Sequence, residues 1–247
     1  MKSWQTIITA AGEDDGSFQQ SGIELPKNLV PFNGTTILGA AIDSYASGNR
    51  NTHVVIRSDE ANLCKTDEIL KVVHPNVSFH TMPRATKGAL CSAAMALDDL
   101  DLELPLIIAA GDSISRGEIK ILLRQFLEED CVAGTLLFDS TLPRWSYARL
   151  SPTNQVLEMA EKIPISRFAS TGLFYFKSVE LFKWATEWVL KENMHTNGAF
   201  YLSSALNYLI MNGENVAGVK LGPNFHYVPL STFHDLYIAE MRQDASL

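Results

Sequence analysis

The chain has 247 residues, of which 46% are apolar and 19% charged, a balance typical of a globular protein with a sizeable core. Its 28 acidic and 20 basic side chains give a net charge of −8, which argues against nucleic acid or an anionic membrane as the main partner. The three cysteines are scattered and form no CxxC pair, which disfavours a disulfide framework and a zinc site. No apolar run approaches the roughly 20 residues of a membrane-spanning helix. The sequence therefore predicts a soluble cytoplasmic protein.

Short apolar runs alternate with helical patterns in the first half of the chain. Strands are predicted at residues 6–10, 53–57, 77–81 and 106–110. Helices are predicted between them, at residues 37–45 (ending at Gly48), 61–73 and 89–97. This alternation predicts an α/β fold with a largely parallel sheet that carries helices on both faces.

The pattern changes after residue 137, where strands follow one another without intervening helices. They are predicted at residues 147–150, 156–160 and 172–176, and we expect them to pair antiparallel. The remaining elements are helices at 180–191 and 202–211, a strand at 216–221 and a helix at 232–241. Because the chain shows neither a linker nor a repeat, we expect a single mixed α/β domain over residues 1–247.

The ends of the predicted parallel strands indicate where a ligand binds, because such sheets bind ligands beyond the carboxyl ends of their strands. These ends are the loop at residues 10–20, the segment at 81–88, and Gly111-Asp112.

Several segments carry an ordered series of motifs: Ile8–Gly12, Leu25–Phe32, Gly34–Leu38, Thr86–Cys91, Pro105–Asp112, Trp145–Arg149, Val156–Ile165, Ser170–Tyr175 and Tyr201–Gly213. In this order they resemble the sugar-phosphate nucleotidyltransferases over nearly the whole chain. The resemblance is closest to a capsule and lipopolysaccharide branch with a Pro-x-Trp-Ser-Tyr-Ala segment.

The resemblance implies a Rossmann-like, GT-A-like fold with a mixed, mostly parallel sheet flanked by helices. Residues 1–135 would form the nucleotide-binding half and residues 136–247 the acceptor-binding half. The implied reaction joins a nucleoside triphosphate to a sugar phosphate or similar small phosphorylated acceptor, with Mg²⁺ as cofactor and pyrophosphate as product, for surface polysaccharide biosynthesis. The oligomeric state stays open, a homo-oligomer included.

The resemblance assigns catalytic roles to Lys27, at the phosphates, and to Asp112, which would hold Mg²⁺. Joining two anions needs cations near the α-phosphate, and a carboxylate at a strand end suits a hard cation. The alternatives are a solvated lysine after a proline turn and an aspartate that caps a following helix.

The resemblance also places other residues at the two substrates. On the nucleotide side they are Ala11, Gly12, Gly16, Ser17 and Gly88, with Lys27 and Asp112; on the acceptor side they are Tyr147, Glu161, Lys162, Thr171 and Gly172. Glu161-Lys162 is alternatively a plain surface pair, and the glycines are alternatively turn or bent-strand residues.

The chain departs from the family pattern at two places. The phosphate loop should carry an arginine, but Ala11–Phe18 has no basic residue and three consecutive carboxylates, Glu13, Asp14 and Asp15. Arg84 and Lys87 are candidate replacements for that charge. Near the C-terminus, Pro229 stands where relatives place a second metal-binding aspartate, so a two-carboxylate site would need Asp14, Asp15 or Asp235.

These departures keep two alternatives open. One is a noncatalytic protein with the same fold that binds a nucleotide, a sugar phosphate or a protein. The other is a GT-A glycosyltransferase, although Gly111-Asp112-Ser113-Ile114 lacks the second aspartate of that class's Asp-x-Asp motif.

Overall fold

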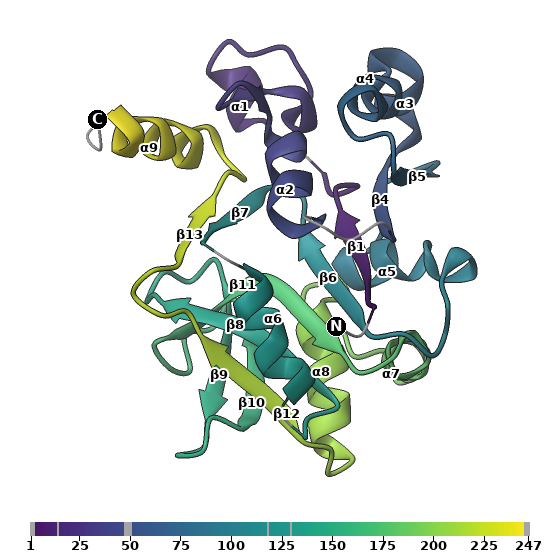
Figure 1. Ribbon diagram of the computed structural model, residues 1–247, viewed down its shortest axis with the longest axis vertical. Coiled ribbons are helices and arrows are strands. Elements are labelled where there is room, and N and C mark those ends of the chain that lie inside the picture. Colours follow the sequence, from purple (N-terminus) through teal and green to yellow (C-terminus); the bar gives the residue numbers. More distant parts are fainter. Residues whose placement is uncertain (1–2, 14, 47–50, 118, 129, 245–247) are drawn as a thin grey trace.

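The computed structural model describes residues 3–13, 15–46, 51–117, 119–128 and 130–244. Within them, a nine-stranded mixed sheet runs in the order β10-β9-β11-β6-β1-β4-β5, with β8 beside β11 and β12 beside β8 (Figure 1). Its strands are β1 (Gln5–Thr9), β4 (Thr52–Arg57), β5 (Val77–Met82), β6 (Leu106–Ala110), β8 (Ala133–Asp139), β9 (Ser146–Leu150), β10 (Val156–Glu161), β11 (Phe168–Phe176) and β12 (Val216–Lys220). Two small sheets pair β2 (Pro31–Phe32) with β3 (Thr35–Thr36), and β7 (Ser113–Arg116) with β13 (His226–Pro229).

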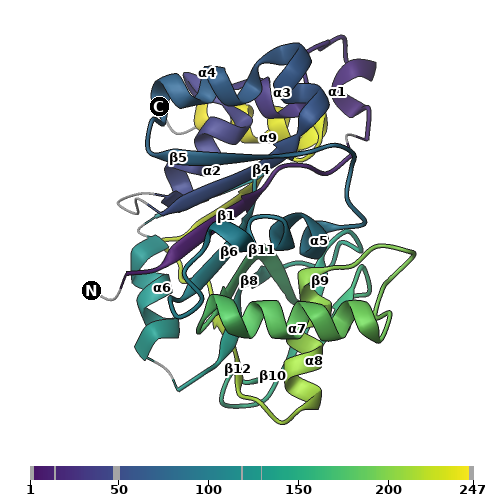
Figure 2. The same cartoon turned by 90° about the vertical axis from the view of Figure 1, so that its right-hand side faces the viewer.

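Helices cover both faces of the main sheet. The helices are α1 (Ser17–Gln20), α2 (Ile37–Ala46), α3 (Ser58–Cys64), α4 (Thr66–Val73), α5 (Ala89–Ala94), α6 (Ile119–Glu128), α7 (Val179–Lys191), α8 (Leu202–Met211) and α9 (Phe233–Asp244), with 3-10 turns at Lys27–Leu29 and Leu97–Asp99. One core cluster joins α5, α7 and α8 to the sheet, and a second joins α2, α3, α4 and α6 to the opposite face. Figure 2 shows α3 and α4 on one side of β1 and β4, and α5 and α7 on the other.

The alternation of side chains along the strands explains this layering. In β1, Ile7 belongs to the first cluster and Ile8 to the second; in β6, Ile108 and Ile107 divide in the same way. Successive side chains of a strand point to opposite faces, so strands with adjacent apolar residues at their centres need helices on both sides. Among the described residues, no helix is long and apolar enough to cross a bilayer.

A third core cluster lies apart from the main sheet, where α9 and the β7–β13 pair form the upper left of Figure 1. Phe18 of α1 and Phe32 of β2 pack there with Leu230 and Leu236. The C-terminal segment therefore covers the loops that follow β1.

The predicted fold class is confirmed. The pairs β1–β4, β1–β6 and β4–β5 are parallel. The predicted antiparallel pairing in the second half is also present, in β10–β9 and in the pairs of β11 with β6 and β8.

Two predicted helices differ from the structure. The helix expected at residues 61–73 is broken into α3 and α4, because Lys65 adopts a left-handed conformation with φ 55°. The helix expected at residues 89–97 ends at Ala94 and is followed by a separate 3-10 turn. Strands β2, β3, β7, β8 and β13 and helices α1 and α6 were not predicted. Gly48 and Asp14 lie outside the described residues.

Candidate functional site

The carboxyl ends of β1 and β6 lie side by side at the centre of the sheet. Thr9 pairs with Ala110, and the Gly111 N–H donates to the Thr9 carbonyl at 3.0 Å. A Cβ at Gly111 would lie 2.9 Å from the Ala10 Cβ, so a glycine allows the two loops to approach this closely. The loops that follow β1 and β6 therefore meet at the edge where such sheets bind ligands.

Lys27 and Asp112 form an ion pair at this edge. The Lys27 Nζ lies 2.7 Å from Asp112 Oδ2, and the two side chains are 17% and 28% exposed, so both are accessible to a ligand. The Asp112 carbonyl accepts the N–H of Leu230 at 2.8 Å, which ties the end of β6 to the end of β13. The alternative that Asp112 caps a helix is wrong, because β7 follows it directly.

Asp112 is the carboxylate that this edge offers to a divalent cation. Among the described residues, no group of three or more His, Cys, Asp or Glu side chains could hold a metal. Asp235, a candidate second ligand, is bound by Arg144 instead, and the Pro229 side chain has no ligand atom. Mg²⁺ is commonly held by one or two carboxylates together with substrate phosphates. Asp112 therefore fits a magnesium site that the substrate completes, and the described side chains offer no such site built from protein ligands alone.

The acidic loop after β1 turns its described carboxylates toward solvent. Glu13 and Asp15 are both exposed. The Asp15 carboxylate accepts the Ser17 N–H at 2.9 Å, and this hydrogen bond lowers the pKa of Asp15, with smaller contributions from the charges of Lys27 and Arg144. The Ser17 hydrogen bond and the charges of Lys27 and Arg144 therefore stabilise the ionised form of Asp15.

The other predicted residues of this loop have structural partners. Ala11 is fully buried, and Gly16 has φ 76° at the start of α1. The Ser17 hydroxyl accepts the Phe233 N–H at 3.1 Å and so holds the first residue of α9. Gly12 is exposed, with open space where a side chain would stand. Gly12 is therefore the exposed one of these four residues.

Arg57 positions the backbone of this loop, a role that the motifs do not indicate. Its Nη1 donates to the Gly12 carbonyl at 2.8 Å, while its guanidinium also binds Asp59 and Glu60. Asn28 Nδ2 bonds the buried Glu60, and burial raises the pKa of Glu60 despite this bond and the Arg57 charge. Arg57 is the last residue of a predicted strand, at the edge where such sheets bind ligands, so its place in the sequence could have identified it as a residue near the site.

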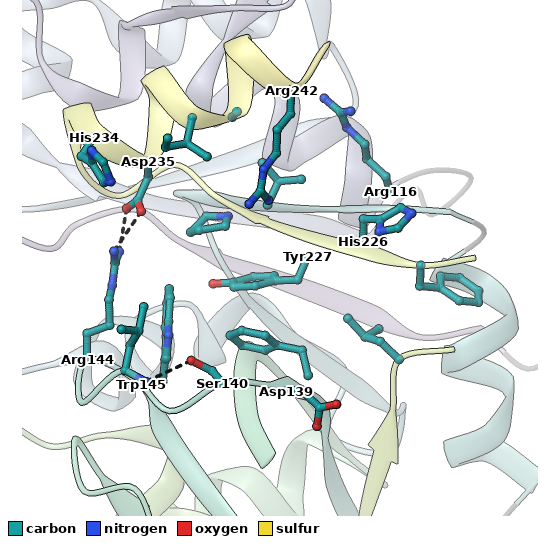
Figure 3. Close-up of a pocket in the computed structure, with 18 residues that line it drawn as sticks. Arg116, Asp139, Ser140, Arg144, Trp145, His226, Tyr227, His234, Asp235 and Arg242 are labelled. Carbon is teal, nitrogen blue, oxygen red and sulfur yellow. Dashed lines mark hydrogen bonds and ion pairs between the residues drawn. The ribbon is translucent and has the colours of Figure 1, made fainter. Parts of the chain in front are cut away.

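Arg144 is a second cation near the site that sequence reasoning missed. Its guanidinium binds both oxygens of Asp235, at 2.9 and 2.6 Å, and the Ser231 hydroxyl at 2.6 Å (Figure 3). Burial alone would raise the pKa of Asp235, but the hydrogen bonds from Arg144 and Thr232 and the Arg144 charge lower it. The Asp112 charge in turn contributes to raising the pKa of Arg144. Arg144 therefore joins the β8–β9 connection to α9, and it interacts electrostatically with Asp112.

The Glu161-Lys162 pair lies at the end of β10. Glu161 accepts hydrogen bonds from the hydroxyls of Ser146 and Ser203, and burial raises its pKa in spite of these bonds and the charge of Lys162. Lys162 has φ 57°, its side chain is exposed, and its Nζ lies 5.9 Å from the centre of the Tyr201 ring. The lysine is thus available to a ligand, while the glutamate is held inside.

The remaining predicted acceptor residues differ in accessibility. Tyr147 is fully buried and its hydroxyl donates to the Leu142 carbonyl at 2.6 Å, which argues against contact of this side chain with a substrate. Thr171 is also fully buried. Gly172 has φ 80° in an irregular part of β11, and a Cβ there would lie 3.3 Å from the Ala110 Cβ. Gly172 therefore lies against Ala110, at the end of β6.

Gly88 is required by the packing of the chain. It has φ 106°, and a Cβ there would lie 2.2 Å from the Phe200 carbonyl oxygen. The missing side chain thus makes room for the segment before α8, and contact of Gly88 with a nucleobase stays a prediction. Arg84 and Lys87 are exposed in the same loop.

Solved structures share this fold. The nucleoside-diphosphate-sugar pyrophosphorylase from Vibrio cholerae RC9 superposes with a TM-score of 0.82 at 18% identity, over 96% of this chain and 100% of that one. The inositol-1-phosphate CTP transferase from T. maritima gives a TM-score of 0.77 at 17% identity, over 98% and 96% of the two chains. No curated protein matches the chain by sequence. The model of the family described as nucleotidyl transferase, however, matches residues 22–220, and the chain therefore belongs to this enzyme family.

Proposed function

We propose that the protein transfers a nucleotidyl group from a nucleoside triphosphate to a sugar phosphate or similar phosphorylated acceptor, for surface polysaccharide biosynthesis. An oxygen of the acceptor phosphate attacks the α-phosphorus, the bond between that phosphorus and the α,β-bridging oxygen breaks, and pyrophosphate leaves. The observation that carries this proposal is the Lys27–Asp112 pair at the joint carboxyl edge of β1 and β6. The names of the two solved relatives, a sugar pyrophosphorylase and an inositol-1-phosphate CTP transferase, agree with a phosphorylated acceptor.

Lys27 and Asp112 have complementary parts in this reaction. The Lys27 ammonium neutralises phosphate oxygens on which negative charge accumulates in the transition state. Asp112 would hold Mg²⁺ together with the phosphates, and the ion's chemistry there is charge neutralisation. When phosphates bind, they compete with Asp112 for the Lys27 ammonium, so the ion pair keeps both groups in place before the substrate arrives.

Arg144 supplies positive charge where the phosphate loop has lost its arginine. The Arg144 charge contributes to lowering the pKa of Asp15, and the Asp112 charge contributes to raising the pKa of Arg144. Arg144 therefore interacts electrostatically with both carboxylates. Asp235 fixes the Arg144 guanidinium through two hydrogen bonds. A side chain that is already fixed loses less conformational entropy when the substrate binds than a mobile lysine would lose.

Lys162 binds the acceptor phosphate in this proposal. Its exposed ammonium carries the charge, and the left-handed backbone turns the chain at the end of β10. The half-buried Glu161 carboxyl accepts hydrogen bonds from two serine hydroxyls, so it positions the turn and leaves the phosphate to Lys162.

A screen for pyrophosphate release tests the proposal, with four nucleoside triphosphates against a panel of sugar and polyol phosphates. We expect release with one pairing, and a loss of about a hundredfold or more in Asp112→Asn, as for loss of a group that stabilises transition-state charge. Asp43→Asn, an exposed aspartate on α2, is the matched control and should retain turnover. Unchanged turnover and magnesium dependence in Asp112→Asn would remove Asp112 from the mechanism.

A noncatalytic binding protein is the second candidate, and the acidic loop favours it. The family match begins at residue 22, so it omits the loop in which carboxylates replace the expected arginine. If the protein binds nucleotide and acceptor yet releases no pyrophosphate with any pairing, this second function is the correct one.

A further inference from the structure

A buried carboxylate lies on α3, next to the turn that carries Lys27. Glu60 is 6% exposed, and a glutamate is seldom this buried unless it is paired. Burial raises the pKa of Glu60, while the Asn28 hydrogen bond and the Lys27 charge act in the opposite direction. Glu60 therefore interacts electrostatically with the lysine of the reaction site, although the reaction proposed above gives it no part.

Asn28 joins Glu60 to the turn that carries Lys27. It follows Lys27 in the 3-10 turn, and it is 3% exposed. Its Nδ2 donates to Glu60 Oε2 at 2.7 Å and to the Ala10 carbonyl at 3.0 Å. An ionised carboxylate and a peptide carbonyl only accept hydrogen bonds, so these partners use both hydrogens of the amide group and fix its orientation. The turn is thus held against α3 and the end of β1.

Arg57 joins the other oxygen of Glu60 to the loop after β1. Its Nη2 lies 3.4 Å from Glu60 Oε1, and its Nη1 donates to the Gly12 carbonyl at 2.8 Å. A peptide is planar, so a carbonyl that is held in place fixes the direction of the whole peptide. One buried carboxylate therefore couples the Lys27 turn to the loop.

We propose that Glu60 is a positioning residue that holds Lys27 in place through Asn28, an inference that rests on the function proposed above. The Lys27 ammonium acts on phosphate oxygens in the transition state, where a displacement of about 1 Å can cost about a hundredfold in rate. A hydrogen bond to a charged group, made by a side chain one residue away, restricts such displacement.

Chemical labelling of lysines tests this link without any substrate. The full-length protein is treated with limiting acetic anhydride, and mass spectrometry compares acetylation of Lys27 with that of the exposed Lys220 on β12. Lys27 is 17% exposed in its pair with Asp112, so it should react slowly while the turn is held. We expect Glu60→Leu to raise the relative acetylation of Lys27 about tenfold, as for a local opening.

Two further variants identify the cause of this change. Glu60→Gln keeps an acceptor oxygen for Asn28, so its acetylation of Lys27 should stay within about threefold of the wild type. Glu68→Leu on α4 makes the same change at a carboxylate that is 66% exposed, and it should leave Lys27 unchanged.

Steady-state kinetics with a productive substrate pair tests whether the link serves the reaction. Glu60→Leu should lower kcat about tenfold or more with little change in the acceptor KM. In a Lys27→Ala background the same substitution should lower kcat less than about twofold, because residues that act through one group are not additive. A merely structural role would lower kcat by a similar factor in both backgrounds.

The inference is overturned if Lys27 is acetylated equally in the wild type and Glu60→Leu, if Glu60→Gln behaves like Glu60→Leu, or if the losses from Glu60→Leu and Lys27→Ala multiply. Should Glu60→Leu show no thermal unfolding transition, Asn28→Ala replaces it, because it removes the same link and keeps the carboxylate. If the wild type releases no pyrophosphate with any pairing, the function proposed above fails, whereas the labelling still confirms or overturns the link between Glu60 and Lys27.

Discussion

Removal of the Arg144 guanidinium should destabilise the protein measurably, because it leaves the Asp235 carboxylate buried without its cation. Breaking a buried ion pair from one side typically costs about 3–5 kcal/mol. Here Arg144 is 34% exposed, and Asp235 keeps hydrogen bonds from Ser231 and Thr232, so we expect a smaller loss of about 2 kcal/mol in Arg144→Ala. At about 2–4 °C per kcal/mol for a chain of this size, the melting temperature should fall by about 4–8 °C.

Thermal unfolding at several pH values tests the cause of this loss. Because the pair lowers the pKa of Asp235, its stabilisation is present above the unfolded-state pKa and is lost as the pH falls through the lower folded-state pKa. The difference between wild type and Arg144→Ala should thus be full at pH 7 and shrink below about pH 4. Arg149→Ala is the control, because its pair with Glu158 is about half exposed and should contribute less than about 1 kcal/mol. Equal melting of the two variants, or a difference that persists undiminished in acid, would refute this account.

Two further predictions concern the reacting charges. Lys27→Ala should lower kcat by about tenfold or more with little change in the acceptor KM, whereas Lys162→Ala should mainly raise the acceptor KM. Steady-state kinetics with both substrates varied distinguishes the two effects. An identical kinetic profile of the two variants would contradict the division of roles. Replacement of the three carboxylates at residues 13–15 by Asn should change the nucleotide Kd less than about threefold, because the described ones face solvent. A gain of tenfold or more, about 1.4 kcal/mol, measured by calorimetry would show instead that the loop repels nucleotide.

The buried framework was predictable because its periodicity is strong. Strand β6 is apolar throughout, and β1 and β4 each have a buried apolar centre, which is typical of strands that are covered on both faces. Strand β8 was missed although it is also apolar. It contains Gly134, where a Cβ would lie 2.4 Å from the Phe126 ring of α6, so a tertiary contact explains a residue that strand propensity disfavours. The break at Lys65 has a similar origin, since the local sequence alone does not encode a left-handed residue.

The site was predictable only in outline. The rule that ligands bind at the carboxyl ends of parallel strands selected Asp112, and the motif after Pro26 selected Lys27. That the two side chains touch, across 85 positions of sequence, follows from packing that neither motif contains. Tyr147 was predicted to contact the acceptor because it belongs to a motif, but its side chain is fully buried. A residue can belong to a motif because it packs in the core and not because it contacts a substrate.

The two departures from the family pattern form one structural unit, although they lie at opposite ends of the chain. Ser17 of the acidic loop accepts the backbone N–H of Phe233, 216 positions away, at the start of α9. The charge of Arg144 acts on Asp15 of the same loop while its guanidinium binds Asp235 of α9. The loop that lacks the expected arginine is therefore joined to the start of α9 by Ser17, and Arg144 acts on carboxylates of both segments. Because the Arg144 charge contributes to lowering the pKa of both Asp15 and Asp235, a substitution that removes this charge alters the electrostatics of both segments.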